Sequence, residues 1–140
     1  MDIKEFAEKF IEAEKEAFQN FNFEPLKAIE DPNVVYHLYP PPELVGHEAH
    51  KQQIMGVKKY LVDIKQEFEY LTGSGDLFAF AYKARYISAG KLPGWPPLGG
   101  EATNDSLFLV RRRNGKVVEV WSNGHVTGID MEARLKTSEK

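Results

Sequence analysis

The sequence contains no cysteine and no long apolar run. The absence of cysteine excludes disulfide bonds, zinc sites built on thiolates and cysteine nucleophiles. A membrane-spanning helix needs roughly 18 consecutive apolar residues, and no segment of the chain approaches that length. The first residues, Met1 to Glu5, are too charged for the apolar centre of a signal peptide. We therefore expect a cytoplasmic protein that has no membrane partner.

An excess of charge of one sign is also missing. The chain has 18 lysines and arginines against 21 aspartates and glutamates, a formal charge of −3. This balance gives no overall attraction to nucleic acid, so we expect no nucleic-acid partner. Aromatic residues, by contrast, make up 12% of the 140 residues. Because each aromatic side chain buries about 150 to 250 Å², these residues can line a cavity as well as fill a core.

The length fits one domain, because domains have roughly 100 to 200 residues. We assign residues 1–130 to it and residues 131–140 to a polar C-terminal tail. Hydrophobic periodicity predicts a helix that begins at Asp2 and ends before Pro25. The other predicted helices cover residues 25–30 and 46–61.

Alternation of polar and apolar residues predicts strands late in the chain. The predicted strands cover residues 34–39, 64–71, 77–88, 102–112 and 116–126. Asn114-Gly115 is the favoured pair for a type I′ hairpin turn. Early helices and late strands predict an α+β fold, in which helices cover one face of a curved antiparallel sheet. A hollow between helix and sheet is where small molecules usually bind.

Several short segments then carry a family resemblance. They are Val34-Val35-Tyr36-His37, Val45-Gly46-His47-Glu48-Ala49, Gly75-Asp76, the loop 94–100 and, most specifically, Asn114-Gly115-Lys116-Val117-Val118-Glu119-Val120-Trp121. Their order resembles the SnoaL-like branch of the nuclear transport factor 2 superfamily, which includes ketosteroid isomerase and small epoxide hydrolases. The resemblance implies a cone-shaped, cystatin-like sheet wrapped around N-terminal helices, a deep apolar cavity and a homodimer through the outer sheet face. It implies no single reaction, because the fold hosts cyclases, isomerases, hydrolases and proteins without catalysis.

The resemblance also implies a catalytic position. In the cyclases of this family a carboxylate four residues after the tryptophan acts as acid or base, and here that position is His125. Trp121, Asn123 and His125 share one face of the strand, so all three face the cavity if Trp121 does. Imidazole titrates near neutral pH and can transfer protons. The alternative is a strand-end histidine that bonds only backbone or water.

His37 and Asp105 are the other predicted catalytic residues. His37 supplies a second titratable group if its face of the first strand lines the cavity; otherwise it is a core histidine with one partner. Asp105 lies well inside a late strand, and burial in a cavity raises the pKa of a carboxyl. Its alternative is a strand-end residue that contacts water or the arginines 111–113.

Aromatic and polar residues complete the predicted site. The predicted ligand-binding residues are Trp121, Asn123, Trp95, Tyr82, Phe80 and Tyr39. On the strand 77–88, the aromatic face is predicted to cover the cavity, and Lys83 and Arg85 to face solvent or a partner; a carboxylate-binding role for Arg85 is the alternative. His47 and His50 have a spacing that can bind a metal, but no third ligand is evident, so we predict no metal and no cofactor.

These features predict a protein that binds a small apolar or cyclic organic molecule. The first hypothesis is a cofactor-independent acid–base enzyme of the cyclase, isomerase or hydrolase class, similar to polyketide cyclases or ketosteroid isomerase. The second is a ligand carrier or sensor without chemistry. The third is a dimeric interaction module whose hollow is filled by side chains. A cavity below a few hundred Å³ would favour this module.

Overall fold

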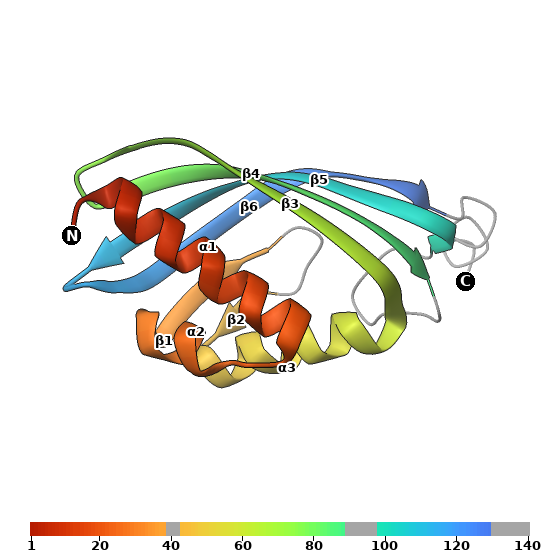
Figure 1. Ribbon diagram of the computed structural model, residues 1–140, viewed down its shortest axis with the longest axis horizontal. Coiled ribbons are helices and arrows are strands. Elements are labelled where there is room, and N and C mark those ends of the chain that lie inside the picture. Colours follow the sequence, from red (N-terminus) through yellow and green to blue (C-terminus); the bar gives the residue numbers. More distant parts are fainter. Residues whose placement is uncertain (39–42, 89–97, 130–140) are drawn as a thin grey trace.

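The computed structural model describes residues 1–38, 43–88 and 98–129, without the side chains of residues 88, 98, 99 and 129. Its helices are α1 (Ile3–Asn20), α2 (Glu24–Ile29) and α3 (His47–Tyr60), and its strands are β1 (Glu30–His37), β2 (Glu43–Val45), β3 (Leu61–Ser74), β4 (Leu77–Ser88), β5 (Leu98–Arg113) and β6 (Lys116–Ile129). The strands form one sheet in the order β2-β1-β6-β5-β4-β3. The long strands arch over α1 and α3 (Figure 1), which confirms the α+β class and the helix-covered curved sheet.

Helix α1 begins where the sequence predicts. Asp2 is its N-cap, and the Asp2 carboxylate accepts a hydrogen bond of 2.8 Å from the backbone N–H of Glu5. The helix ends at Asn20, and its C-cap Phe21 has a left-handed φ of 53°. In the ranges given above, no helix has both the length and the apolar character needed to cross a membrane.

The buried stripe of α1 packs on the concave face of the sheet. The rings of Phe6 and Phe10 both meet Phe78 edge-on, with centroids 6.1 Å apart. Phe10 is fully buried. Glu14 lies on the same stripe, one turn after Phe10 and one turn before Phe18, and only 8% of it is exposed. A carboxyl group is therefore held among aromatic rings on the inner side of the fold.

The predicted antiparallel sheet needs one correction. Strand β1 pairs in parallel with β6, whereas the other pairings are antiparallel. β1 also begins at Glu30 rather than at residue 34, and the short strand β2, which the sequence pattern does not indicate, pairs with it. Because β1 pairs with a strand on each side, its backbone groups have hydrogen-bond partners. The strand can therefore extend beyond the β-branched residues on which the sequence prediction relied.

Two local predictions for the hairpins are confirmed. Asn114 and Gly115 have φ values of 52° and 74°, the two positive values that a type I′ turn requires. On β4, the residues on the concave face are mostly buried: Phe78, Phe80, Tyr82, Ala84 and Tyr86. Lys83 and Arg85 are exposed on the convex face, where Arg85 pairs with Glu101 at 2.8 Å.

Candidate functional site

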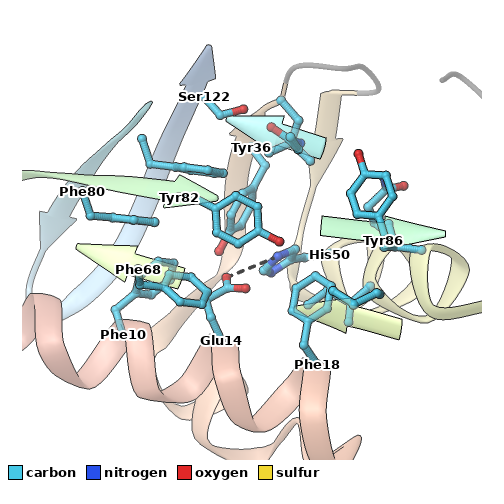
Figure 2. Close-up of a pocket in the computed structure, with 17 residues that line it drawn as sticks. Phe10, Glu14, Phe18, Tyr36, His50, Phe68, Phe80, Tyr82, Tyr86 and Ser122 are labelled. Atoms are coloured by element: carbon cyan, nitrogen blue, oxygen red, sulfur yellow. Dashed lines mark ion pairs between the residues drawn. The ribbon is translucent and has the colours of Figure 1, made fainter. Parts of the chain in front are cut away.

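A cavity of about 110 Å³ lies between α1, α3 and the concave face of the sheet (Figure 2). Its aromatic walls include Phe10, Phe18, Phe68, Phe80, Tyr82 and Phe108. The volume is below the few hundred Å³ that are usual for a ligand pocket. An engineered apolar cavity of about 150 Å³ holds one benzene molecule. The cavity therefore has room for a compact molecule, or for one ring of a larger one.

Two ionisable side chains of opposite type meet at the cavity wall. Glu14 from α1 and His50 from α3 both line it, and His50 Nε2 lies 3.5 Å from Glu14 Oε1. Their side chains are 10% and 6% exposed. Across the cavity stand neutral polar groups from the sheet, namely Tyr82, Tyr86, Asn104 and Ser122. A bound molecule would thus contact one charged wall and one neutral polar wall.

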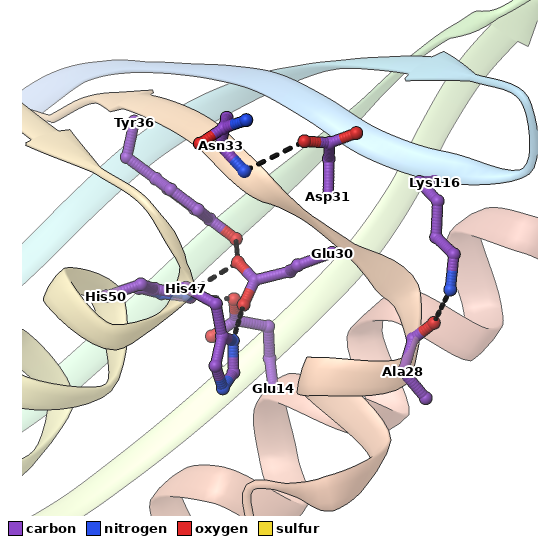
Figure 3. A network of polar contacts seen from close by, with 9 residues as sticks. All are labelled: Glu14, Ala28, Glu30, Asp31, Asn33, Tyr36, His47, His50 and Lys116. Atoms are coloured by element: carbon purple, nitrogen blue, oxygen red, sulfur yellow. Dashed lines mark hydrogen bonds and ion pairs between the residues drawn. The ribbon is translucent and has the colours of Figure 1, made fainter.

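Behind His50 lies a second carboxylate, which does not line the cavity (Figure 3). Glu30, at the start of β1, has a fully buried side chain and accepts a hydrogen bond of 2.8 Å from His50 Nδ1. His47 Nδ1 lies 2.6 Å from the other oxygen of Glu30, and the Tyr36 hydroxyl donates to this carboxylate as well. The Tyr36 and His50 rings are stacked, with centroids 3.9 Å apart. These contacts fix the orientation of His50, so that Nε2 faces Glu14.

Burial and charge shift the pKa values of this network in different directions. Burial raises the pKa of Glu14 to about 7, against the lowering effect of His50. Burial also acts to raise the pKa of Glu30, but the His50 charge and the hydrogen bonds from its three partners outweigh it, and that pKa is lowered. For His50, burial acts to lower the pKa, but Glu14 and Glu30 together raise it. The raised pKa of His50 favours the imidazolium, and beside it Glu14 gains and loses its proton near neutral pH.

Burial also raises the pKa of the Tyr36 hydroxyl well above its usual value, and the neighbouring Glu30 charge adds to the shift. The hydroxyl therefore stays protonated and serves as a donor to Glu30. Tyr82 is another buried hydroxyl, and it accepts a hydrogen bond of 2.9 Å from Gln66. Neither tyrosine is ionised at neutral pH, so proton exchange in the cavity falls to Glu14 and His50.

The structure does not bring His125 or Asp105 to this cavity. Asp105 stands opposite His125 in the β5–β6 register, and both lie on the convex face of the sheet. His125 is exposed and Asp105 is half-buried. Trp121 and Asn123 do share the face of His125, but the condition that Trp121 faces the cavity is not met. The concave positions of β6 are occupied instead by residues such as Val120 and Ser122.

His37 lies on the convex face too. Its Nδ1 is 2.6 Å from Glu43, its Nε2 is 2.8 Å from Glu119, and its ring stacks on Trp121 with centroids 5.6 Å apart. His37, Trp121 and Asn123 border a shallow hollow on that outer surface. The structure therefore brings these predicted residues together, but on the side of the sheet away from the aromatic cavity.

The remaining predicted ligand-binding residues have mixed outcomes. Phe80 and Tyr82 line the cavity, as the aromatic face of β4 indicates. Trp95 and Tyr39 lie outside the described residues. His47 and His50, considered for a metal because of their spacing, both contact Glu30. Among the residues that the structure describes, no group of three or more suitable side chains is arranged to hold a metal ion.

Sequence reasoning missed the roles of Glu14, His50 and Glu30; of the three it considered only His50, as a metal ligand with His47. A signal existed for the first two, because Glu14 is four residues from both Phe10 and Phe18, and His50 is four residues before the buried Ile54. A charged residue within an apolar stripe marks a buried polar group that needs partners. No local signal marks Glu30, since its partners come from β1 and α3 and depend on the tertiary fold.

The arched sheet and the helices on its concave face define a cone-shaped α+β protein of the ketosteroid isomerase-like and nuclear transport factor 2-like class. The family follows from the sequence comparison. The family model of the SnoaL-like polyketide cyclases matches residues 8–129, so the chain belongs to this family. Family and fold support a small-molecule-binding fold. No match was found among curated proteins.

Solved structures agree on the fold. TsrD from Streptomyces laurentii superimposes with a TM-score of 0.74 at 15% identity, covering 89% of this chain and 90% of its own. IdmH from Streptomyces antibioticus superimposes with a TM-score of 0.65 at 22% identity, and 98% of each chain is covered. A nuclear transport factor 2-like protein from Anabaena variabilis superimposes with a TM-score of 0.70 at 13% identity, covering 90% of this chain and 91% of its own. At these identities the likeness shows the fold alone.

Proposed function

We propose that this protein is an acid–base enzyme for a compact, largely apolar organic molecule, with Glu14 and His50 as its catalytic residues. One observation carries the proposal: an imidazole and a carboxyl group meet 3.5 Å apart at the wall of an aromatic cavity. Glu30 is a positioning residue, because it holds the other nitrogen of His50 from outside the cavity. A buried carboxylate behind a histidine fixes the tautomer and orientation of the ring.

The proton movements of such a reaction balance without a cofactor. The Glu14 carboxylate accepts a proton from the substrate, and His50 Nε2 donates one to the substrate oxygen or carbon that gains electron density. The proton on Glu14 then returns to His50, so that both groups regain their starting states. A carboxyl with a pKa of about 7 is a stronger base than ordinary glutamate and is still ionised in about half of the molecules at pH 7. Isomerisation and ring closure are reactions of this kind.

The substrate class follows from the cavity. Aromatic rings around the charged pair accept apolar or cyclic carbon skeletons, and the volume of about 110 Å³ limits the enclosed part to about one small ring. The family of SnoaL-like polyketide cyclases supports a carbonyl compound as substrate. Abstraction of a proton next to a carbonyl group is the simplest step that a carboxylate and an imidazolium perform together.

Deuterium exchange tests the proposal. Cyclopentanone and cyclohexanone are incubated with the protein in D₂O, and exchange next to the carbonyl is followed by NMR. We expect exchange above the buffer rate, reduced about 100-fold or more in His50→Gln and Glu14→Gln. His37→Gln is the matched control, because His37 also bridges two carboxylates but lies outside the cavity. Exchange that is absent from the wild type, or equal in Glu14→Gln, contradicts the proposal.

Two competing interpretations predict different outcomes. If His125 with His37 or Asp105 transfers the proton, His125→Ala loses activity; full retained activity removes that assignment. If the protein is a carrier or sensor, a ligand raises the melting temperature and is recovered chemically unchanged.

The dimeric interaction module is the second candidate function, and a specific observation favours it. The cavity is smaller than usual ligand pockets, and the convex face exposes Leu107 (61%) and Leu109 (41%). A second copy of the chain covering this face is the expected homodimer. Sedimentation of the wild type and of a Leu107→Glu variant tests it: a dimer that becomes a monomer supports the shared interface, and a wild-type monomer contradicts it.

A further inference from the structure

We propose that the preferred ligand of the aromatic cavity is a small organic cation, a compact substituted ammonium compound held between the Glu14 carboxylate and the surrounding rings. The inference rests on the proposed function only in taking this cavity as the binding site. It adds a chemical class that neither the family nor the acid–base proposal specifies, because both are compatible with neutral molecules.

The charges at the cavity wall are not balanced. Of the described residues that line the cavity, only Glu14 and His50 carry charge, and no lysine or arginine is among them. The His50 imidazolium is engaged at 2.8 Å by Glu30, a carboxylate outside the cavity. Two carboxylates thus share one imidazolium, and the second contact, to Glu14, is longer at 3.5 Å. With Glu14 ionised and His50 protonated, Glu14, His50 and Glu30 together carry a net charge of −1 at the edge of an apolar space; His47, which contacts the other oxygen of Glu30, does not line the cavity.

The rings around Glu14 suit a cation. Figure 2 shows Glu14 among the side chains of Phe10, Phe18, Phe68 and Tyr82. The faces of such rings attract ammonium groups, and the attraction is stronger where water is excluded. One of these rings already has an ammonium group nearby, because Lys15 Nζ lies 5.8 Å from the centroid of Phe68. Rings and carboxylate together form the kind of aromatic cage that recognises quaternary ammonium ligands.

The volume points in the same direction. A space of about 110 Å³ is less than the cavity of about 150 Å³ that holds benzene, so a compact, nearly spherical group fills it best. A trimethylammonium group has that shape. A flat ring system of two or more rings exceeds this volume.

The affinity for a cation depends on the ionisation of Glu14. Two charged groups face Glu14, namely His50 on α3 and Glu30 at the start of β1. Its neutral neighbours are the hydroxyls of Tyr36 on β1 and Tyr82 on β4. Lys15, over Phe68, is paired with Glu12. Because burial raises the pKa of Glu14 to about 7, its negative charge is largely absent at pH 6 and present at pH 8. Cation binding should therefore strengthen about tenfold between these pH values.

A matched pair of ligands isolates the effect of the ligand's positive charge on binding. Choline and its neutral carbon isostere, 3,3-dimethylbutan-1-ol, have the same shape and differ in one atom and one charge. Binding of each to the wild type is measured by NMR titration at pH 6 and pH 8. We expect choline to bind at least about tenfold more tightly than the isostere at pH 8, and the preference to shrink at pH 6.

Two variants test whether Glu14 and the aromatic rings cause the preference for choline. Glu14→Gln should bind choline about as weakly as it binds the isostere, and its unchanged affinity for the isostere shows that the cavity is intact. Phe68→Leu keeps an apolar wall but removes one ring face, so it should weaken choline several-fold more than the isostere. If Glu14→Gln does not fold, Phe68→Leu and the comparison of pH 6 with pH 8 still test whether the cavity prefers choline to its neutral isostere.

The inference is overturned if the isostere binds as tightly as choline, if neither binds, or if choline binding is unaffected by Glu14→Gln and by pH. These outcomes are separate from those of the proposed function. Ketone exchange that depends on His50 can be present while choline fails to bind, in which case the site is catalytic and its ligand is neutral.

Discussion

The molecule contains two histidines that are each placed between two carboxylates and stacked on an aromatic ring. His50 lies between Glu30 and Glu14 and stacks on Tyr36; His37 lies between Glu43 and Glu119 and stacks on Trp121. The first group is almost fully buried on the concave side of the sheet. In the second, on the convex side, the exposed fractions of the side chains range from 32% to 61%.

The comparison shows that environment, rather than residue type, gives the buried group its chemistry. The pKa of both histidines is raised by their carboxylate partners, His37 mainly through its hydrogen bonds to Glu119 and Glu43. Only in the buried group does desolvation bring a carboxyl, Glu14, to a pKa of about 7. Water around the convex group screens its charges and competes for its hydrogen bonds.

Removing the central carboxylate should have the largest effect. Glu30→Ala leaves His50, His47 and Tyr36 without their common acceptor, and we expect a loss of about 3 to 5 kcal/mol in the free energy of unfolding, measured with urea. The matched convex variant Glu119→Ala should lose about 1 kcal/mol or less. Equal losses would mean that burial does not distinguish the two groups.

The stability of the wild type should fall as the pH rises. The folded-state pKa of Glu14, about 7, exceeds the ordinary glutamate value of 4.5, so the folded state binds its proton more tightly. This stabilisation is present in acid and is lost as the pH rises to 7, a change of about 3 kcal/mol. The raised pKa of His50 acts in the same direction, whereas the lowered pKa of Glu30 makes that carboxylate stabilising above pH 4.5.

Urea unfolding between pH 5 and pH 8 measures this dependence. Glu14→Gln should flatten it, because glutamine has no proton to lose, and should be more stable than the wild type at pH 8. His37→Gln should leave most of the slope in place, since that group is solvated. A Glu14→Gln variant with the wild-type slope would assign the pH dependence to other groups.

Tyr36→Phe should have an intermediate effect. It removes one donor to the Glu30 carboxylate and keeps the stacked ring, so we expect a loss of about 2 kcal/mol in unfolding free energy. The pKa of Glu30 should rise, since the hydroxyl helps to lower it. Thermal unfolding and carboxylate NMR titration measure the two effects. A variant as stable as the wild type would show that this hydrogen bond contributes little.

His125→Ala should have the smallest effect. The side chain is exposed on the convex face, so we expect a change within about 0.5 kcal/mol in stability. Ketone exchange should be unchanged. A large loss of exchange would restore the prediction that the last strand carries the catalytic group.

Local features of the fold could be predicted from the sequence because they depend on neighbours in the chain. The Asp2 cap, the Asn114-Gly115 turn and the aromatic face of β4 are of this kind. The parallel pairing of β1 with β6 could not, because it joins segments more than 80 residues apart.

The candidate site was harder to predict for the same reason. Alternation correctly grouped Trp121, Asn123 and His125 on one face, but alternation does not say which face is buried. The choice depends on register with β5, where Leu107 and Leu109 are the exposed residues opposite Asn123 and Trp121. Glu14 was visible in the sequence as a charge on an apolar stripe, whereas its meeting with His50 is a tertiary contact between two helices.

The buried histidine group, and not the convex one, should meet the ligand. Side-chain NMR of the imidazoles during titration with cyclohexanone tests it most directly, because all four histidines are observed in one experiment. We expect the His50 resonances to shift with ligand concentration and those of His37 and His125 to stay in place. Shifts of His37 or His125 with an unmoved His50 would contradict it.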